Sequence, residues 1–278
     1  MKIVDAQVHI WAADTPARPW PGRGAPAHRE PLGKDELLGA MDQAGVARAI
    51  LVPPSWEGDR NDLSIAAARA HPDRFAVMGR FNPDQPDARE VLAGWRRQPG
   101  MLGMRFTFHT PILRQPLLDG AFDWVWSACE REGIPIMALF HHEYLRLLDG
   151  IAERHLGLRL VLDHLGLKSG HDVDEALNFA TLDQVLVLAR RPNIAVKTSA
   201  LPCYTRDRYP FRALHEPLRR VVDAFGPARS FWGSDYSRLP CSYRESIDFF
   251  GAALPGLSDA DRASIMGRGI SGWLGWTD

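Results

Sequence analysis

The most regular feature of this chain is the alternation of short apolar, β-branched segments with longer segments whose apolar residues recur every three or four positions. The short segments are typical of buried strands, and the three-to-four spacing is typical of amphipathic helices. Parallel neighbours in a sheet need crossover connections, which are usually helices. The pattern predicts eight parallel strands, at 3–9, 48–52, 75–81, 102–108, 135–140, 159–164, 194–199 and 230–235.

Helices are expected between these strands. The segment 34–44 is the clearest, because Leu37, Leu38 and Met41 share one face and Gly45 follows as a stop signal. The same kind of spacing predicts further helices at 61–70, 117–132, 143–155, 175–190, 211–225 and 243–254.

Eight strand–helix units can close into an α/β (β/α)8 TIM barrel. The length of 278 residues suits such a barrel, which typically needs about 250 residues. An open, doubly wound sheet is the alternative, but no Gly-x-Gly-x-x-Gly follows the first strand, and polar residues gather at many strand ends. We expect one barrel domain over 1–278, with a proline-rich inserted loop at 12–33 as a candidate lid and a C-terminal helix and tail at 258–278.

Composition narrows the class of protein further. The formal net charge of −1 argues against a general nucleic-acid or membrane-surface role. Three scattered cysteines do not form a disulfide framework or a cysteine-based zinc site. No secretory signal pattern opens the sequence, and no apolar run reaches the roughly 18 residues of a membrane span. We expect a cytoplasmic enzyme with a small-molecule partner, and the oligomeric state stays open, a homodimer being the commonest assembly.

Polar residues at the ends of the predicted strands are the candidates for chemistry, because TIM-barrel enzymes place their catalytic groups there. Histidines and carboxylates that converge on one mouth suit metal-assisted or general-base hydrolysis. In chain order the candidates are Gln7 and His9, Arg80, Arg105 and His109, His141 and His142, Asp163 and His164, Lys197 and Ser199, and Asp235.

The first of these strands ends in Asp5-Ala6-Gln7-Val8-His9. Side chains alternate along a strand, so Asp5, Gln7 and His9 are expected on one face, pointing into the barrel mouth. A neutral imidazole binds a divalent metal well, whereas an amide oxygen binds Zn²⁺ poorly. The segment therefore indicates a hydrolase pocket and leaves its metal in question.

The sequence resembles the amidohydrolase superfamily, in particular the amidohydrolase-2 group, which includes sugar lactonases and 2-pyrone-4,6-dicarboxylate lactonase. The resemblance covers nearly the whole chain. It rests on four segments: Asp5-Ala6-Gln7-Val8-His9-Ile10-Trp11, Leu160-Val161-Leu162-Asp163-His164-Leu165-Gly166, Val196-Lys197-Thr198-Ser199 and Trp232-Gly233-Ser234-Asp235.

The resemblance implies catalytic roles for His9, His164 and Asp235. The family pattern has a His-x-His pair on the first strand, and here Gln7 stands in place of its first histidine. One divalent metal, with Zn²⁺ the first choice, would be held by His9, Asp235 and His164. A metal-free site is the other reading, because some lactonases of this group are thought to work without metal.

The expected reaction is hydrolysis of a lactone or similar cyclic ester. Asp235 would take a proton from the attacking water, while His164 and His9 polarise the carbonyl. An arginine fork matches a carboxylate, so the basic strand-end residues predict a substrate with an anionic substituent. The substrate-binding candidates are Gln7, Arg80, Arg105, His142, Lys197, Arg238 and Trp11.

Several interpretations stay open at this stage. Arg80, Arg105 and Lys197 could belong to structural networks inside the barrel. Adjacent strand residues face opposite sides, so only one of His141 and His142 is expected in the pocket, and His142 is favoured. The alternative functions are a metal-dependent decarboxylase of an aromatic or unsaturated acid, and a non-catalytic barrel that binds a small acidic ligand.

Overall fold

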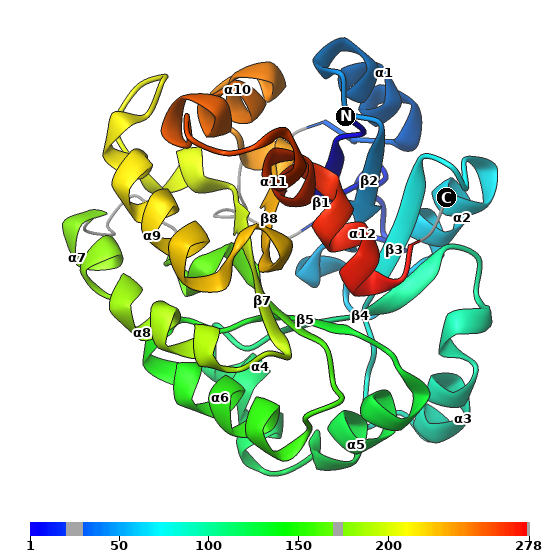
Figure 1. The fold of residues 1–278 in the computed structure, drawn as a ribbon. Helices are drawn as coiled ribbons and strands as arrows, with labels where there is room; N and C mark the ends of the chain where they lie inside the picture. The colour runs from blue at the N-terminus through cyan, green and yellow to red at the C-terminus, as the bar shows by residue number, and fades with distance from the viewer. Residues whose placement is uncertain (21–29, 169–174, 277–278) are drawn as a thin grey trace.

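Eight parallel strands form one barrel-like sheet in the computed structural model, which describes residues 1–20, 30–168 and 175–276 (Figure 1). They pair in sequence order, each with the next. Their bounds are β1 Val4–Val8, β2 Arg48–Leu51, β3 Phe75–Gly79, β4 Met101–Thr107, β5 Ile136–Leu139, β6 Leu160–Leu162, β7 Ile194–Ser199 and β8 Ser230–Gly233. The N–H of Asp235, just after β8, donates to the Gln7 carbonyl of β1 at 2.9 Å, which joins the two ends of the sheet. The predicted (β/α)8 barrel is confirmed.

Helices surround the barrel (Figure 1). Their bounds are α1 Lys34–Ala44, α2 Asp62–Ala70, α3 Ala88–Ala93, α4 Pro111–Leu118, α5 Asp123–Glu132, α6 Leu145–Arg154, α7 Glu175–Ala180, α8 Leu182–Leu186, α9 His215–Phe225, α10 Tyr243–Ala253, α11 Asp259–Ala263 and α12 Gly269–Leu274. None of the helices in the described ranges has the length and apolar character that crossing a bilayer requires.

Three of the expected helices are wrong in extent, and neither α3 nor most of α4 was predicted. The segment expected as 211–225 becomes the α-helix α9 only from His215. The segment expected as 117–132 holds the last two residues of α4 and then α5, because Gly120 takes a φ of 80° between them. A left-handed residue ends a helix, and glycine adopts that conformation without a Cβ clash. The segment expected as 175–190 is interrupted after α7. The short helix α3 was missed because its six residues carry too little periodic signal.

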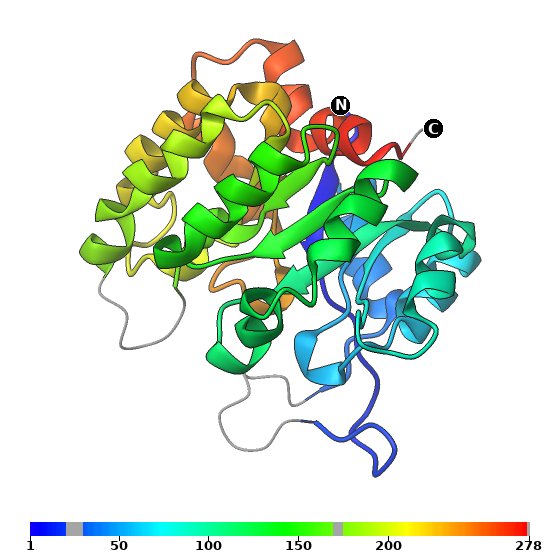
Figure 2. The ribbon, with the colours of Figure 1, turned by 90° about the horizontal axis from the view of Figure 1, so that it is seen from below.

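One end of the barrel is closed by its own C-terminal segment. Interior side chains of the strands, such as Val4, Ile50 and Phe231, form an apolar layer with Ile270 and Leu274 of α12. Figure 2 shows α12 at one end of the barrel and residues 12–20 at the opposite end. The predicted C-terminal helix at 258–278 is divided into α11, a π-helical turn and α12, and residues 277–278 lie outside the described residues.

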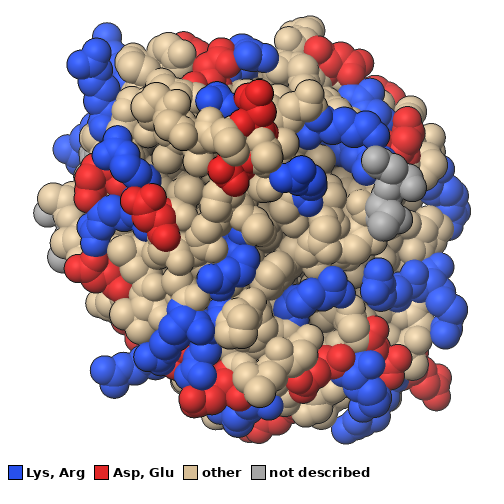
Figure 3. Space-filling view, in the orientation of Figure 1, with Lys and Arg blue, Asp and Glu red and all other residues tan. Residues whose placement is uncertain are grey.

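The other end of the barrel interior is polar. Arg105, Asp163, Lys197 and Ser199 continue the inward-facing positions beyond the apolar layer, and all four are buried. Side chains on the outward-facing positions pack instead against the helices in a second, larger apolar cluster. The surface is unlike this interior: on the face in Figure 3, Lys and Arg are interspersed with Asp and Glu. Buried charged side chains therefore gather at the C-terminal ends of the strands, the end of the barrel that we call its mouth.

The described part of the inserted segment 12–33 lies at the same end of the barrel as the mouth (Figure 2). The Arg18 guanidinium contacts Glu57 at 2.8 Å and Asp62 at 2.5 Å, and the Trp20 indole N–H donates to the Ala12 carbonyl at 2.9 Å. Residues 21–29 of the predicted loop lie outside the described residues. A lid role stays a prediction.

Candidate active site

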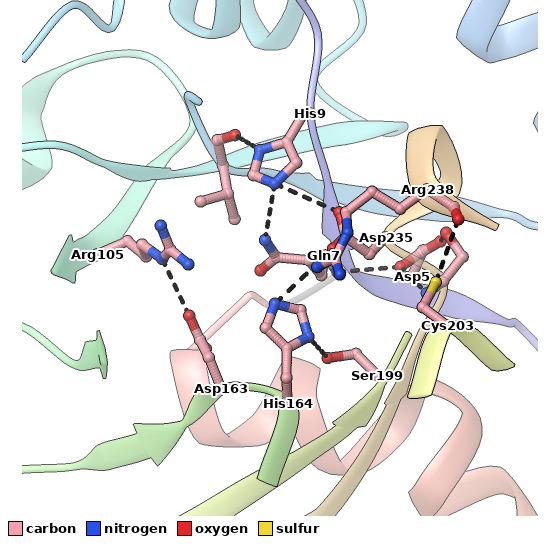
Figure 4. Close-up of polar contacts among 12 residues, drawn as sticks. Asp5, Gln7, His9, Arg105, Asp163, His164, Ser199, Cys203, Asp235 and Arg238 are labelled. Atoms are coloured by element: carbon pink, nitrogen blue, oxygen red, sulfur yellow. Dashed lines mark hydrogen bonds and ion pairs between the residues drawn. The ribbon is translucent and has the colours of Figure 1, made fainter. Parts of the chain in front are cut away.

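Three side chains from distant parts of the sequence meet at the C-terminal mouth. His9 follows β1, His164 follows β6 and Asp235 follows β8 (Figure 4). His9 Nε2 lies 3.3 Å from Asp235 Oδ1, and His164 Nε2 lies 3.8 Å from Asp235 Oδ2. The Asp235 side chain is 1% exposed and that of His9 is 16% exposed, so solvent reaches the group from the His9 side.

The backbone at two of these positions is unusual. His164 has a φ of 51° and Asp235 a φ of 52°, both in the left-handed region. Non-glycine residues there cost energy and cluster at functional sites, where the surrounding structure holds them in place. Gly166 follows with a φ of 66°, and a Cβ on it would lie 2.7 Å from the Phe140 carbonyl oxygen. The Asp-His-Leu-Gly segment therefore makes a sharp turn that lifts the His164 imidazole toward Asp235.

The first strand contains a bulge that changes the expected facing of its polar residues. The pairing of β1 with β2 shifts register between Asp5 and Val8. Val4 and Ala6 both face the interior, whereas the Asp5 carboxylate accepts hydrogen bonds from Ser234 and from the Tyr243 hydroxyl of α10, the latter at 2.6 Å. The prediction that Asp5 shares a face with Gln7 and His9 is wrong, because the extra residue of a bulge reverses the alternation.

Gln7 lies between His9 and Lys197. Its Nε2 is 3.1 Å from His9 Nε2, and its Oε1 accepts a hydrogen bond from the Lys197 ammonium. His9 Nδ1 lies 2.5 Å from the Val52 carbonyl oxygen, to which it donates. A histidine whose Nδ1 carries the proton presents a lone pair at Nε2, and Gln7 donates to that lone pair.

Lys197 and Arg105 share one carboxylate, that of Asp163. Lys197 Nζ lies 2.6 Å from Asp163 Oδ1, and Arg105 Nε donates to Asp163 Oδ2 at 3.0 Å. Burial acts to raise the pKa of Asp163, but the two cations outweigh it and hold the pKa below its ordinary value. Burial lowers the pKa of Lys197, and Asp163 opposes that shift. Both cations therefore belong to an ion-pair network inside the barrel, which was one of the two interpretations left open for them by the sequence.

Arg80 differs from these two cations. Its Nη2 donates to Thr107 at 3.3 Å, while its Nε and Nη1 make no hydrogen bond to any described residue. Burial, together with the charge of Arg105, lowers the pKa of Arg80 to about 10, so it is still charged at neutral pH. A buried guanidinium with two unused donors is costly unless an anion joins it.

Arg238 lies beside the catalytic candidates. Its Nη1 is 3.1 Å from Asp235 Oδ2, and its guanidinium lies over the Tyr204 ring at 5.7 Å. Its side chain is 25% exposed. Among the described residues of this mouth, the four cations Arg80, Arg105, Lys197 and Arg238 accompany the two carboxylates of Asp163 and Asp235, which favours an anionic ligand.

The structure places His142 and Trp11 away from the contacts just described. His142 Nε2 lies 3.4 Å from Glu143, whereas the ring of its neighbour His141 packs against His109 at 5.8 Å. Trp11 is 4% exposed, and its indole N–H donates to the Glu30 carbonyl at 3.1 Å. Trp11 therefore anchors the base of the inserted segment, and substrate-binding roles for it and for His142 stay predictions.

The protonation states follow from burial and neighbouring charge. Burial would raise the pKa of Asp235, but His9 and Arg238 outweigh burial, and the pKa lies below its ordinary value. Burial lowers the pKa of His164 to about 3, although Asp235 opposes the shift, and burial likewise lowers the pKa of His9. At neutral pH the group is a carboxylate flanked by two neutral imidazoles.

Sequence reasoning missed residues that hold the site in place. The backbone N–H of Arg80 donates to Asn61 Oδ1 at 2.7 Å, and Asn61 Nδ2 donates to the Arg80 carbonyl at 2.9 Å. Asn61 precedes α2, where asparagine is typical of a helix cap, so nothing in the sequence indicated this contact. Ser199 Oγ lies 2.8 Å from His164 Nδ1. Ser199 was a strand-end candidate without an assigned role.

The donor set only partly suits a zinc ion. Ligands of a tetrahedral Zn²⁺ at about 2.0–2.1 Å lie about 3.4 Å apart, and the His9–Asp235 pair has a comparable spacing of 3.3 Å. The lone pair of His9, however, already accepts the Gln7 amide. Among the described residues, no group of three or more His, Cys, Asp or Glu side chains is arranged to hold a metal. The residues as they stand do not fit the metal centre that the family resemblance implies.

Two imidazoles and a carboxylate at the C-terminal mouth of a parallel barrel define the class of TIM-barrel hydrolases. Comparison with known proteins gives the family. Residues 4–268 match the family model described as amidohydrolase. The chain belongs to the amidohydrolase family, and the predicted resemblance is confirmed.

Individual relatives share most of its length. An L-fucono-1,5-lactonase of Burkholderia ambifaria is 29% identical over 251 residues, which cover 85% of this chain and 81% of that protein. A solved amidohydrolase from Burkholderia multivorans with bound zinc has a TM-score of 0.84 at 23% identity, covering 99% of each chain. A solved putative 2-pyrone-4,6-dicarboxylic acid hydrolase from Pseudomonas putida has a TM-score of 0.77 at 20% identity, covering 100% of this chain and 98% of that one. The two solved structures support the fold.

Proposed function

We propose that this protein hydrolyses a lactone that carries an anionic substituent, with Asp235 as the general base. One observation carries the proposal: Asp235 is a buried carboxylate whose Oδ1 makes no hydrogen bond to any described residue, although two imidazoles flank it. A buried polar atom without a partner is rare in a folded protein and calls for an explanation. A water molecule that donates to Oδ1 is poised for deprotonation. The family and the named lactonase relative support this chemistry.

Attack on the lactone carbonyl needs a donor for the developing oxyanion. We assign this role to His164. We take the Ser199 hydroxyl as the donor to Nδ1, which leaves the proton of the neutral ring on Nε2, 3.8 Å from Asp235 Oδ2. His9 has no N–H to offer, because its Nδ1 proton is committed to Val52. We therefore assign His9 to positioning beside Asp235, in place of the carbonyl polarisation expected from the resemblance.

The reaction closes with cleavage of the ring C–O bond. Water adds to the carbonyl carbon, Asp235 accepts the water proton, and the tetrahedral intermediate expels the ring oxygen. The protonated Asp235 then returns the proton to that oxygen, so the product is a hydroxy acid and the base is regenerated. Arg238, whose Nη1 lies 3.1 Å from Asp235 Oδ2, stabilises the ionised carboxylate before proton transfer from water and again after the proton has been returned.

The anionic substituent is assigned to Arg80 and Arg105. Arg80 has two donors without a partner among the described residues, and the charge of Arg105 contributes to lowering the pKa of Arg80. A substrate carboxylate can accept two parallel N–H bonds from a guanidinium. Binding there would remove the cost of burying an unneutralised cation.

The test is a substrate panel with the purified protein. L-Fucono-1,5-lactone represents neutral sugar lactones, and 2-pyrone-4,6-dicarboxylate represents acidic ones. We expect ring opening of both kinds, with a higher kcat/KM for the acidic compound. Carbon dioxide release from an aromatic acid without ring opening of any lactone would support the decarboxylase alternative. Tight binding of the acidic compound without turnover would support the non-catalytic alternative.

A further inference from the structure

Gln7 occupies the position from which a first-strand histidine would reach a metal, and its amide is held from both sides. The Lys197 ammonium contains only donors, so it must face Oε1 of Gln7. That orientation turns the Gln7 amide N–H toward His9 Nε2, 3.1 Å away. His9 in turn is free to accept there, because its proton lies on Nδ1 against the Val52 carbonyl. The three contacts are consistent with one another and with a single tautomer of His9.

Lys197, the last residue in this series of contacts, is held in place by an ion pair. Lys197 is completely buried and lies 2.6 Å from Asp163 Oδ1. Arg105 occupies the other oxygen of the same carboxylate. One negative charge thus serves two cations, and one of these cations, Lys197, contacts Gln7 through Oε1. A divalent cation approaching His9 would meet both this charge and an amide N–H where it needs a lone pair.

We propose that Gln7 and Lys197 together replace a metal ion beside His9. The Lys197 ammonium supplies the positive charge, and the Gln7 amide transmits it as a hydrogen bond that fixes the orientation and tautomer of His9. The inference rests on the proposed active site but not on which lactone is its substrate. Its consequence is that the native site excludes zinc and that a single substitution at Gln7 admits it.

The test measures zinc binding by isothermal titration calorimetry, with zinc alone as the probe. Three proteins are compared: the native protein, Gln7→His, and Gln184→His as a matched control on the exposed face of α8. We expect Gln7→His to bind one zinc on the order of 10²-fold more tightly than the native protein. The control should match the native protein. Native binding as tight as that of Gln7→His would overturn the proposal.

A second measurement needs no variant. The ring-nitrogen chemical shifts of His9, read by ¹⁵N NMR, report which nitrogen carries the proton. The proposal requires the Nδ1–H tautomer, and an Nε2–H tautomer at neutral pH would contradict it.

The two proposals fail in different ways. Zinc exclusion with the Nδ1–H tautomer but no lactone turnover would retain this inference and overturn the proposed function. Lactone turnover by a native protein that binds zinc tightly would do the reverse.

Discussion

Two buried aspartates at neighbouring strands have opposite environments. Asp5 of β1 accepts four hydrogen bonds: Oδ1 takes the Gln7 and Ser234 N–H groups at 2.9 Å each, and Oδ2 takes the Ser234 and Tyr243 hydroxyls. Asp235 after β8 is equally buried, but its Oδ1 has no hydrogen-bond partner among the described residues. Both residues belong to motifs that carried the family resemblance.

The difference teaches that burial does not by itself mark a catalytic carboxylate. Asp5 is surrounded by neutral donors, and burial raises its pKa to about 6 although the four hydrogen bonds oppose the shift. Asp235 is surrounded by basic side chains, which hold its pKa below the ordinary value against burial. Asp5 thus ties β1, β8 and α10 together, while Asp235 Oδ1 has no hydrogen-bond partner among the described residues, as the proposed general base requires.

The largest expected effect follows from removing the base. Asp235→Asn should lower kcat about 10³-fold, within the range for loss of a general base, while Asp5→Asn should lower it less than about tenfold. The reason is that an amide at 235 cannot accept the water proton, whereas an amide at 5 still offers an oxygen to the two N–H groups. Steady-state assays on the best lactone of the panel measure both. Equal losses in the two variants would remove the distinction between the aspartates.

The stability of the protein should depend on pH through Asp5. Its pKa is about 6 in the folded state, against an ordinary value of 3.8 for an aspartate, so between these pH values the folded state retains a proton that the unfolded state releases. The stabilising contribution is therefore complete below about pH 4 and lost as pH rises past 6, with a magnitude on the order of 3 kcal/mol. Urea unfolding of the native protein and Asp5→Asn between pH 4 and pH 7 measures it.

The informative quantity is the difference in unfolding free energy between native protein and Asp5→Asn, because the other titrating groups cancel. This difference should fall as pH rises. A difference that is constant, or that grows with pH, would show that the Asp5 carboxyl is not raised in pKa.

The buried guanidinium of Arg80 is compared next with that of an exposed arginine. Arg80→Met should raise KM for an acidic lactone by about 10- to 100-fold, which corresponds to the roughly 1.5–3 kcal/mol of a charge-assisted hydrogen bond. KM for a neutral lactone should change little. Arg69→Met, on the exposed face of α2, is the matched control. An equal rise for acidic and neutral lactones would show that Arg80 does not recognise charge.

The smallest effect concerns Asn61, which positions Arg80. Asn61→Ala should raise KM for the acidic lactone about fivefold and leave kcat unchanged, because it loosens the Arg80 backbone without touching the base. Asn178 makes the same pair of contacts with the backbone of Lys168, at 3.0 and 2.9 Å. Asn178→Ala is therefore the control, and a loss of the same size in both variants would indicate a general effect on stability.

Much of the site was predictable because strand ends converge in a barrel whatever the sequence between them. His9, His164 and Asp235 end three predicted strands, and the closure of the sheet brings them together. Asn61 could not be predicted, because its partner is the backbone of Arg80, nineteen positions away. A contact with a main-chain group leaves no complementary side chain to find in the sequence.

The alternation of apolar segments with helical ones determined the barrel, and the motifs at its strand ends determined the family and the principal catalytic candidates. These features are local, and a fold that buries eight apolar strands under helices follows from them. Only the tertiary structure decided how the charges are shared. The bulge in β1 directs the Asp5 side chain away from that of Gln7, and Asp163 pairs with both Lys197 and Arg105 while Arg80 keeps unused donors. Such pairing depends on distances across several strands, which a linear pattern does not contain.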